Sequence, residues 1–223
     1  ERKMQCIKDT IKNINIVIGC NIGCSYCYAR MNNNRFHTID DFNKPVFFEN
    51  KLKMLNNKRH TAYLLTGQSD LSGWNEEWKD KVFSKMKENE NTQYIFLTKR
   101  PENINLKETP DNGWFGVTVT SSKEKTRIDY LRNNIKAKHY HITFEPMFDD
   151  VGKLDLNNIS WIVIGTETGN RKGKISSKRE WVFNIYNQAK EKNIPVFMKE
   201  DLLGILNEDE FVQEFPKEFG GIK

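Results

Sequence analysis

Three cysteines stand close together near the start of the sequence, within the run IGCNIGCSYCYA at residues 18–29. Cys20, Cys24 and Cys27 follow the spacing C-x3-C-x2-C. Thiolates are the usual ligands of iron–sulfur clusters, and a four-iron cluster normally takes four of them. Three thiolates on one tight loop can hold three corners of a [4Fe–4S] cluster and leave one iron open. An open metal position is where chemistry occurs, as at catalytic zinc, so this loop predicts a catalytic centre.

A structural zinc ion is the alternative for the same loop, with Cys6 or His37 as a further ligand. Structural zinc sites more often use two C-x2-C-like pairs that lie well apart in the sequence. The sequence has no second pair, so the spacing favours the iron–sulfur cluster.

All four cysteines fall within the first 27 residues. An auxiliary cluster would need several more thiolates, so we expect one cluster only. Oxidising compartments favour disulfide cysteines spread through a chain, whereas clustered thiols indicate a reducing, cytoplasmic setting. We find no apolar run long enough to span a membrane and no signal peptide at the start, so we expect no membrane partner.

The net charge is modestly positive, because 35 lysines and arginines stand against 30 acidic residues and give +5. This balance permits a nucleic-acid partner. No basic run is as clustered as in a dedicated nucleic-acid-binding patch, so the sequence alone does not support one.

Short apolar runs alternate with amphipathic stretches along the chain. They predict strands at residues 15–19, 62–67, 94–98, 114–120, 139–144, 161–165 and 195–198. Runs of this kind are typical of strands buried on both faces of a parallel sheet. Helical periodicity predicts helices at 45–55, 75–89 and 208–215, and two capping boxes, Ser121 with Glu124 and Ser177 with Glu180, predict two more.

Strands that alternate with helices form right-handed βαβ units. The sequence therefore predicts an α/β fold, a partial or nearly complete parallel (β/α) barrel of about six to seven strands. We expect a single domain over residues 1–223.

Polar side chains follow most of the predicted strands. The active sites of parallel barrels lie at the C-terminal ends of the strands, so we expect these side chains to meet around one opening. The candidates are Thr66, Gly67, Ser69, Asp70, Lys99, Thr118, Thr120, Glu145, Glu167 and Lys199.

Three of these residues are candidates for catalysis or substrate contact: Glu145, Glu167 and Lys199. A carboxylate at a buried strand end costs free energy unless it is paired, so we expect Glu145 either to hold the ribose hydroxyls or to pair with Lys199 across the barrel. Glu167 stands in a glycine-flanked loop that suits the approach of a ligand. The alternative is that these residues form structural ion pairs.

The cysteine spacing, with Tyr26 just before the third cysteine, resembles the signature of the radical S-adenosylmethionine (SAM) enzymes. The resemblance implies a partial barrel with a [4Fe–4S] cluster on Cys20, Cys24 and Cys27. It also implies that the unique iron chelates SAM, and that reductive cleavage gives methionine and a 5′-deoxyadenosyl radical for hydrogen abstraction. Tyr26 would lie near the adenine, and the electron would come from a donor such as flavodoxin or ferredoxin.

By the same resemblance, Thr66 to Asp70 stand where the superfamily has a Gly-rich segment that binds the SAM amino group. The Gly-Gly-Glu triplet of that segment is absent, and the alternative is that Asp70 caps a turn. Lys99 and Arg100 could neutralise the SAM carboxylate or a substrate anion, and the alternative is a solvated turn before Pro101. Thr118 and Thr120 could bind the ribose or carboxylate of SAM. Plain strand propensity explains these threonines almost as well.

The strand-end phrases SDL, LTKRP, GVTV, EP, GxExG and a late FxK, in this order, bring the resemblance closer. The chain resembles radical SAM mobile pair proteins of the B type, from phages and mobile elements, which are distant relatives of the spore photoproduct lyase. The resemblance implies a second radical SAM protein encoded nearby and leaves the substrate open. The alternatives are a zinc-stabilised module without catalysis and a radical enzyme that modifies nucleic acid.

Overall fold

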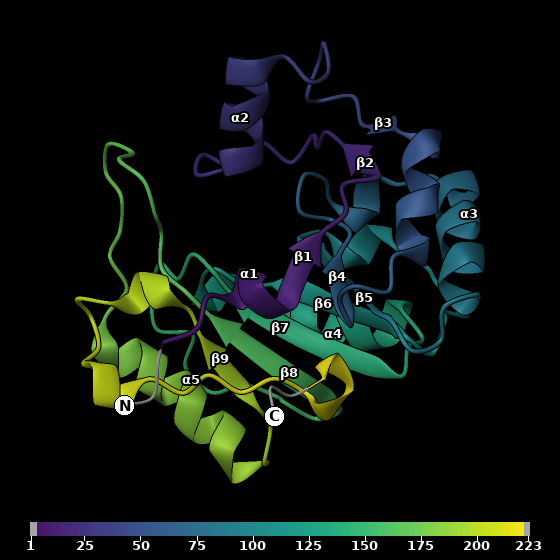
Figure 1. Cartoon of the computed structure of the whole chain (residues 1–223). Coiled ribbons are helices and arrows are strands. Elements are labelled where there is room, and N and C mark those ends of the chain that lie inside the picture. Colours follow the sequence, from purple (N-terminus) through teal and green to yellow (C-terminus); the bar gives the residue numbers. More distant parts are fainter. Residues whose placement is uncertain (1–3, 221–223) are drawn as a thin grey trace.

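Seven parallel strands form one sheet in the order β1-β4-β5-β6-β7-β8-β9, which curls into a half-barrel (Figure 1). The structure, a computed structural model, describes residues 4–220. The predicted α/β partial parallel barrel is confirmed. The strands are β1 (Ile11–Asn13), β4 (Ala62–Leu64), β5 (Gln93–Thr98), β6 (Gly113–Thr118), β7 (His139–Phe144), β8 (Ile159–Ile164) and β9 (Val196–Met198).

Helices follow alternate strands of the sheet. Buried residues of α3 (Glu76–Lys87), α4 (Thr126–Asn134) and α5 (Arg179–Glu191) join the main hydrophobic core. The other helices are α1 (Ile7–Thr10), α2 (Tyr28–Phe36) and the 3₁₀ turns η1 (Glu49–Asn56), η2 (Leu71–Gly73), η3 (Pro101–Asn103), η4 (Ser122–Glu124), η5 (Glu200–Leu202), η6 (Glu208–Glu210) and η7 (Lys217–Phe219). Among the helices of residues 4–220, none is both long enough and apolar enough to cross a bilayer.

The strand predicted at residues 15–19 was wrong. Only β2 (Val17–Ile18) forms there, and it pairs antiparallel with β3 (Val46–Phe47) outside the main sheet. The first strand of the half-barrel is β1, whose sequence is Ile-Lys-Asn. A three-residue edge strand with two polar residues carries no apolar run, so sequence pattern could not reveal it.

The structure also differs from the sequence prediction at two helices and at two helix caps. Residues 45–55 begin as β3 and continue as the 3₁₀ turn η1, and residues 208–215 hold only the short turn η6. Glu124 accepts from Thr120 and not from Ser121, whereas the Ser177 hydroxyl donates to Met147 O. These hydrogen bonds replace the capping bonds that the sequence predicted at the two helix starts.

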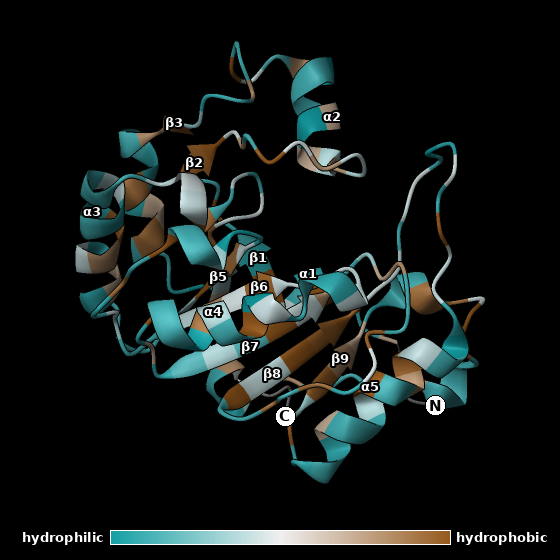
Figure 2. Cartoon of the chain, turned by 180° about the vertical axis from the view of Figure 1, so that it is seen from behind, coloured by the Kyte–Doolittle hydropathy of each residue, from teal (hydrophilic) through white to brown (hydrophobic). Residues whose placement is uncertain are grey.

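The two faces of the sheet carry different cores. On the helix-covered face, Phe96 and Phe115 stack with ring centroids 4.9 Å apart. On the concave face, Trp114, Trp161 and Phe197 pack with Phe219 from the C-terminal segment. These side chains are 0–2% exposed, so an aromatic floor fills the N-terminal half of the concave face. In Figure 2 the strands β8 and β9 are largely hydrophobic, whereas α2, which lies apart from them, is largely hydrophilic.

The sheet does not close, because β1 and β9 are its two edges. The segment before α1 crosses between them. Gln5 N donates to Gln213 Oε1 at 2.8 Å, and Cys6 Sγ donates to Glu200 Oε1 at 2.9 Å. We call this segment, residues 5–6, the seam strap. It joins the two edges by bonds that lie outside any strand ladder.

His141 fills the space above Gly116 on the concave face. The imidazole is 1% exposed, and its Nε2 lies 3.0 Å from Phe96 O, which accepts its hydrogen. Burial lowers the pKa of His141 to about 4, so the ring is neutral. His141 is therefore a structural histidine held by a backbone hydrogen bond.

Substituting Gly116→Ala should therefore destabilise the fold. A Cβ atom there would lie 2.4 Å from the His141 ring, and overpacking of this kind costs about 1–3 kcal/mol. Urea unfolding should show this loss, and Gly116→Ala combined with His141→Ala should lose less than the two single losses added together. Strict additivity would show that the two residues do not compete for space.

Candidate functional site

The cysteine loop, residues 20–27, is fixed to the C-terminal edge of the half-barrel. Gly19 forms a parallel bridge with Ser69, and Gly19 N donates to Gln68 O at 2.9 Å. Cys20 N donates to Phe42 O at 2.7 Å. The backbone therefore ties the loop both to the segment after β4 and to the returning chain (Figure 1).

Gly19 is required at the start of this loop. Its φ is +115°, and a Cβ atom would lie 2.8 Å from Pro45 Cα. Any other residue would be strained and would push the two backbone segments apart.

The three loop thiols are free and half-buried. Cys27 caps α2, because its Sγ accepts from Arg30 N at 3.4 Å. Burial raises the pKa of Cys20, and Asp70, Cys24 and Cys27 add to this. The donor set, three thiols on one loop, has the chemistry that an iron–sulfur cluster uses.

Across residues 4–220, no group of three or more His, Cys, Asp or Glu side chains stands in a position to hold a metal ion. A cluster on the three cysteines therefore stays a prediction from their type and spacing.

Arg30 holds the loop closed from α2. Its NH2 group donates to Cys20 O at 2.7 Å and to Asn43 Oδ1 at 2.9 Å. Its guanidinium lies over the Phe42 ring, 5.0 Å from the centroid. Sequence reasoning missed this residue, because its partners Phe42 and Asn43 come from a later segment that lies next to it only in the folded chain.

Tyr26 reaches from the loop to the ends of two strands. Its ring packs edge-on against Phe148 at 5.5 Å, and Lys99 Nζ lies 6.0 Å from its centroid. Phe148 N donates to Thr120 O at 2.8 Å. The structure thus brings together Tyr26, Lys99 and the end of β6, which the sequence assigned to one site.

Tyr28 is a site residue that sequence reasoning did not single out. Its hydroxyl donates to Gly67 O at 2.6 Å, although the side chain as a whole is 52% exposed. Burial of the hydroxyl end raises the pKa of Tyr28, and the nearby Cys27 and Glu145 charges add to this. Tyr28 therefore links the cysteine loop to the segment after β4.

The Asp70 carboxylate caps the turn η2, which was the alternative to a role in binding SAM, and its oxygens bond to other protein groups. Its Oδ1 accepts from Ser72 N, Ser72 Oγ and Thr98 Oγ1, the last at 2.6 Å. Its Oδ2 accepts from Lys99 N at 2.8 Å. Asp70 thus joins the ends of β4 and β5 and positions Lys99.

The neighbouring hydroxyl groups are also used inside the protein. Thr66 Oγ1 accepts from Leu97 N at 2.8 Å, and Ser69 Oγ accepts from Trp74 Nε1 at 3.0 Å. Thr120 Oγ1 donates to Glu124 at 2.7 Å, and the Thr118 side chain is 3% exposed. Gly67 packs on β1, where a Cβ atom would lie 2.8 Å from Asn13 Nδ2. What these segments can offer a ligand is mainly backbone.

Glu145 and Lys199 form an ion pair across β8, which is one of the two roles that the sequence suggested for Glu145. Phe144 and Met198 are both in register with Ile164, so Glu145, Gly165 and Lys199 share the next layer. A Cβ atom on Gly165 would lie 3.1 Å from the Glu145 side chain. The glycine between the two charged residues therefore allows them to meet.

Asp201 completes this cluster and was missed by sequence reasoning. Its Oδ2 lies 3.3 Å from Lys199 Nζ, and its Oδ1 accepts from Thr166 N at 3.1 Å. Burial opposes the charge on Lys199, but Glu145 and Asp201 outweigh it and hold its pKa above the usual value. Burial, together with the second carboxylate, raises the pKa of Asp201 to about 6. The sequence feature that could have indicated Asp201 is an acidic residue two positions after Lys199.

Glu167 is not free to act on a ligand. The carboxylate is buried and accepts from Arg171 Nε at 2.5 Å and from Arg171 NH2 at 2.8 Å. The hydrogen bond from Arg171 lowers the pKa of Glu167, so the pair is ionised. For Glu167, the structure has the ion pair that was the alternative reading.

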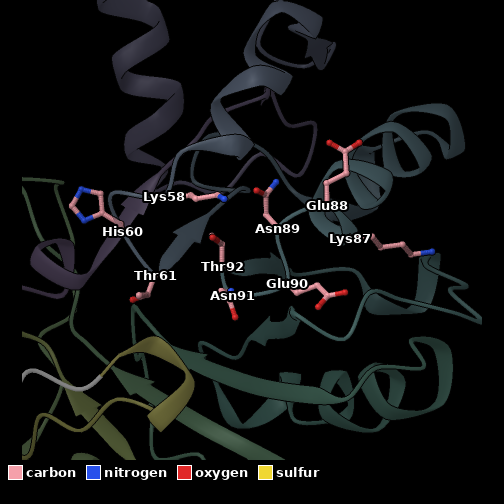
Figure 3. A pocket seen from close by; sticks show the side chains of 9 residues that line it. All are labelled: Lys58, His60, Thr61, Lys87, Glu88, Asn89, Glu90, Asn91 and Thr92. Atoms are coloured by element: carbon pink, nitrogen blue, oxygen red, sulfur yellow. The ribbon is translucent and has the colours of Figure 1, made fainter.

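Two cavities lie on the opposite side of the sheet, at the N-terminal ends of the strands. One, of about 360 Å³, is bordered by residues that precede β4 and β5, among them His60, Thr61 and Thr92 (Figure 3). Another, of about 540 Å³, lies beside the start of β7 at His139. Neither contains a candidate site residue.

Substituting Arg30→Met should open the cysteine loop. Hydrogen bonds to charged groups contribute about 1.5–3 kcal/mol, so thiol labelling of Cys20 should accelerate about tenfold or more. Mass spectrometry of labelled peptides reads this rate, with Cys6 as an internal reference. Arg35→Met on the same helix is the matched control, and equal labelling in both variants would contradict the role of Arg30.

Asp201 should make folding stability depend on pH. Its pKa rises from 3.8 to about 6 on folding, so the folded state holds an extra proton between these values. As pH rises from about 4 to 6.5, wild type should lose up to about 3 kcal/mol relative to Asp201→Asn. Urea midpoints across this range test the difference, and parallel curves for the two proteins would contradict it.

Comparison with known proteins adds the family. Neither the curated proteins nor the solved structures gave a match. A family model described as "Protein of unknown function (DUF5131)" matches residues 5–220. Because the match covers nearly all of the sequence, the chain belongs to the DUF5131 family.

Proposed function

We propose that this chain is a radical SAM enzyme. The observation that carries the proposal is the C-x3-C-x2-C loop tied by Gly19 and Ser69 to the C-terminal edge of a parallel half-barrel. That edge is where parallel barrels place their chemistry. The resemblance of the cysteine spacing to the radical SAM signature adds support.

Cys20, Cys24 and Cys27 would hold a [4Fe–4S] cluster. When bound, the cluster supplies one electron that splits SAM into methionine and a 5′-deoxyadenosyl radical, which takes a hydrogen atom from the substrate and becomes 5′-deoxyadenosine. The electron would come from a reduced carrier such as flavodoxin or ferredoxin in a reducing, cytoplasmic setting. A second radical SAM protein encoded nearby is a candidate partner.

Around that chemistry, the residues of this chain would have separate tasks. Tyr26 offers its ring to the adenine, and Lys99, fixed by Asp70, offers its ammonium to the SAM carboxylate. The Gly67 carbonyl, which already accepts from Tyr28, has a second lone pair for the SAM amino group.

Lys199 and its two carboxylates would stand on the substrate side. With Glu145 and Asp201 both against it, Lys199 stays protonated and can orient a polar substrate group. Asp201 can hold or release a proton near neutral pH, because its pKa is about 6.

A zinc-stabilised module without catalysis is the second candidate. It is favoured by the internal use of Asp70, Thr120 and Glu167, which leaves fewer side chains for a ligand.

Anaerobic reconstitution separates the two candidates. Wild type should bind about four irons and four sulfides per chain and, after reduction with SAM, release 5′-deoxyadenosine. Cys24→Ala should lose both, whereas Cys6→Ala, which removes the cysteine outside the loop, should keep both. An iron-free chain that binds one zinc tightly would overturn the proposal.

A further inference from the structure

We propose that the substrate is single-stranded nucleic acid, held between α2 and the loop that joins β8 to α5. This inference rests on the proposed function for the reaction, but not for the binding. Both elements project beyond the C-terminal edge of the sheet, α2 directly after the cysteine loop (Figures 1 and 2).

The loop between β8 and α5 carries the positive charge. Residues 168–178, here the basic loop, hold Arg171, Lys172, Lys174 and Lys178 and no acidic residue. Residues 168–170 and 172–176 are exposed. A +4 charge over eleven residues stands out in a chain whose whole net charge is +5.

The basic loop has a defined shape. Glu167, buried at its base, accepts two hydrogen bonds from Arg171 and one from Ile175 N at 3.4 Å. Lys174 Nζ donates to Gly169 O at 3.2 Å. The Glu167–Arg171 pair therefore neutralises one of the four charges and leaves three exposed lysines, Lys172, Lys174 and Lys178, on a loop of fixed shape.

α2 carries two exposed aromatic rings. Tyr28 and Phe36 are 52% and 65% exposed, and the Arg35 guanidinium lies 5.1 Å from the Phe36 centroid. The sequence of α2 contains no acidic residue. Exposed rings with stacked arginine are the platforms on which unpaired bases stack, while nearby cations track the phosphates.

These features favour a nucleic acid over an acidic protein and a single strand over a duplex. Carboxylates of a protein would match the lysines but would leave the exposed rings without a planar partner. Bases in a duplex are already stacked and cannot reach the rings. Tyr28 follows Cys27 directly, so a base stacked on Tyr28 would bring its sugar to the cysteine loop.

Fluorescence anisotropy with a labelled single-stranded 20-mer, as DNA and as RNA, tests the inference on the full chain. Three phosphate contacts, by Arg35, Lys172 and Lys178, predict a slope of log K against log salt of about −2. Arg35→Gln with Lys172→Gln should reduce its magnitude by about 1.4. Lys107→Gln with Lys136→Gln, two exposed lysines away from α2 and the basic loop, is the control and should leave it unchanged.

The aromatic term is tested separately with Phe36→Ala, which should weaken single-strand binding about fivefold or more, with Phe36→Leu intermediate. Three results would overturn the inference. They are no binding of the 20-mer at low salt, an equal loss of salt slope in the Arg35/Lys172 and Lys107/Lys136 double variants, or binding of poly-glutamate as tight as that of the 20-mer. Iron content is measured on each sample. Binding without a cluster would leave this inference standing and remove the proposed reaction, whereas a cluster without binding would do the reverse.

Discussion

The bridge between Gly19 and Ser69 fixes where the cysteine loop stands on the half-barrel. It places the first cysteine against the segment after β4, and two hydrogen bonds of Asp70, from Thr98 and Lys99, hold this segment to the end of β5. Arg30 then closes the loop onto its own start. Rigid backbone contacts near a reactive group preserve geometry better than contacts made by long side chains. The cysteine loop thus takes its position from the sheet, although it lies outside it.

The cluster of Glu145, Lys199 and Asp201, at the C-terminal ends of β7 to β9, follows from a different constraint. Three neighbouring strands end in one layer, and the glycine on the central strand leaves room for Glu145 and Lys199 to meet. Burial in this layer, with the Glu145 carboxylate as a smaller contribution, raises the pKa of Asp201. The titration of Asp201 therefore derives mainly from its burial beside a second carboxylate.

The long buried strands could be predicted from sequence because both faces demand apolar residues. β7 was predicted with its observed bounds, and β5 and β6 nearly so. β1 could not be predicted, since its three residues lie at an edge and only Ile11 is buried. In the site, the pairing of Glu145 with Lys199 was predictable, because two charges at buried strand ends must compensate each other. The partners of Asp70 and Glu167 were not predictable, because they depend on how another strand end and a loop fold back.

The seam strap has a consequence for how the open side of the half-barrel is held. The edges β1 and β9 are joined there by Gln5 with Gln213 and by Cys6 with Glu200, and not by a strand ladder. Apolar packing also links them, because Ile11 of β1 and Phe197 of β9 belong to one buried cluster with Phe219. Segments from opposite ends of the sequence therefore close the gap that the strands leave open. Loss of the C-terminal segment would expose Trp114 and Trp161, which pack against Phe219.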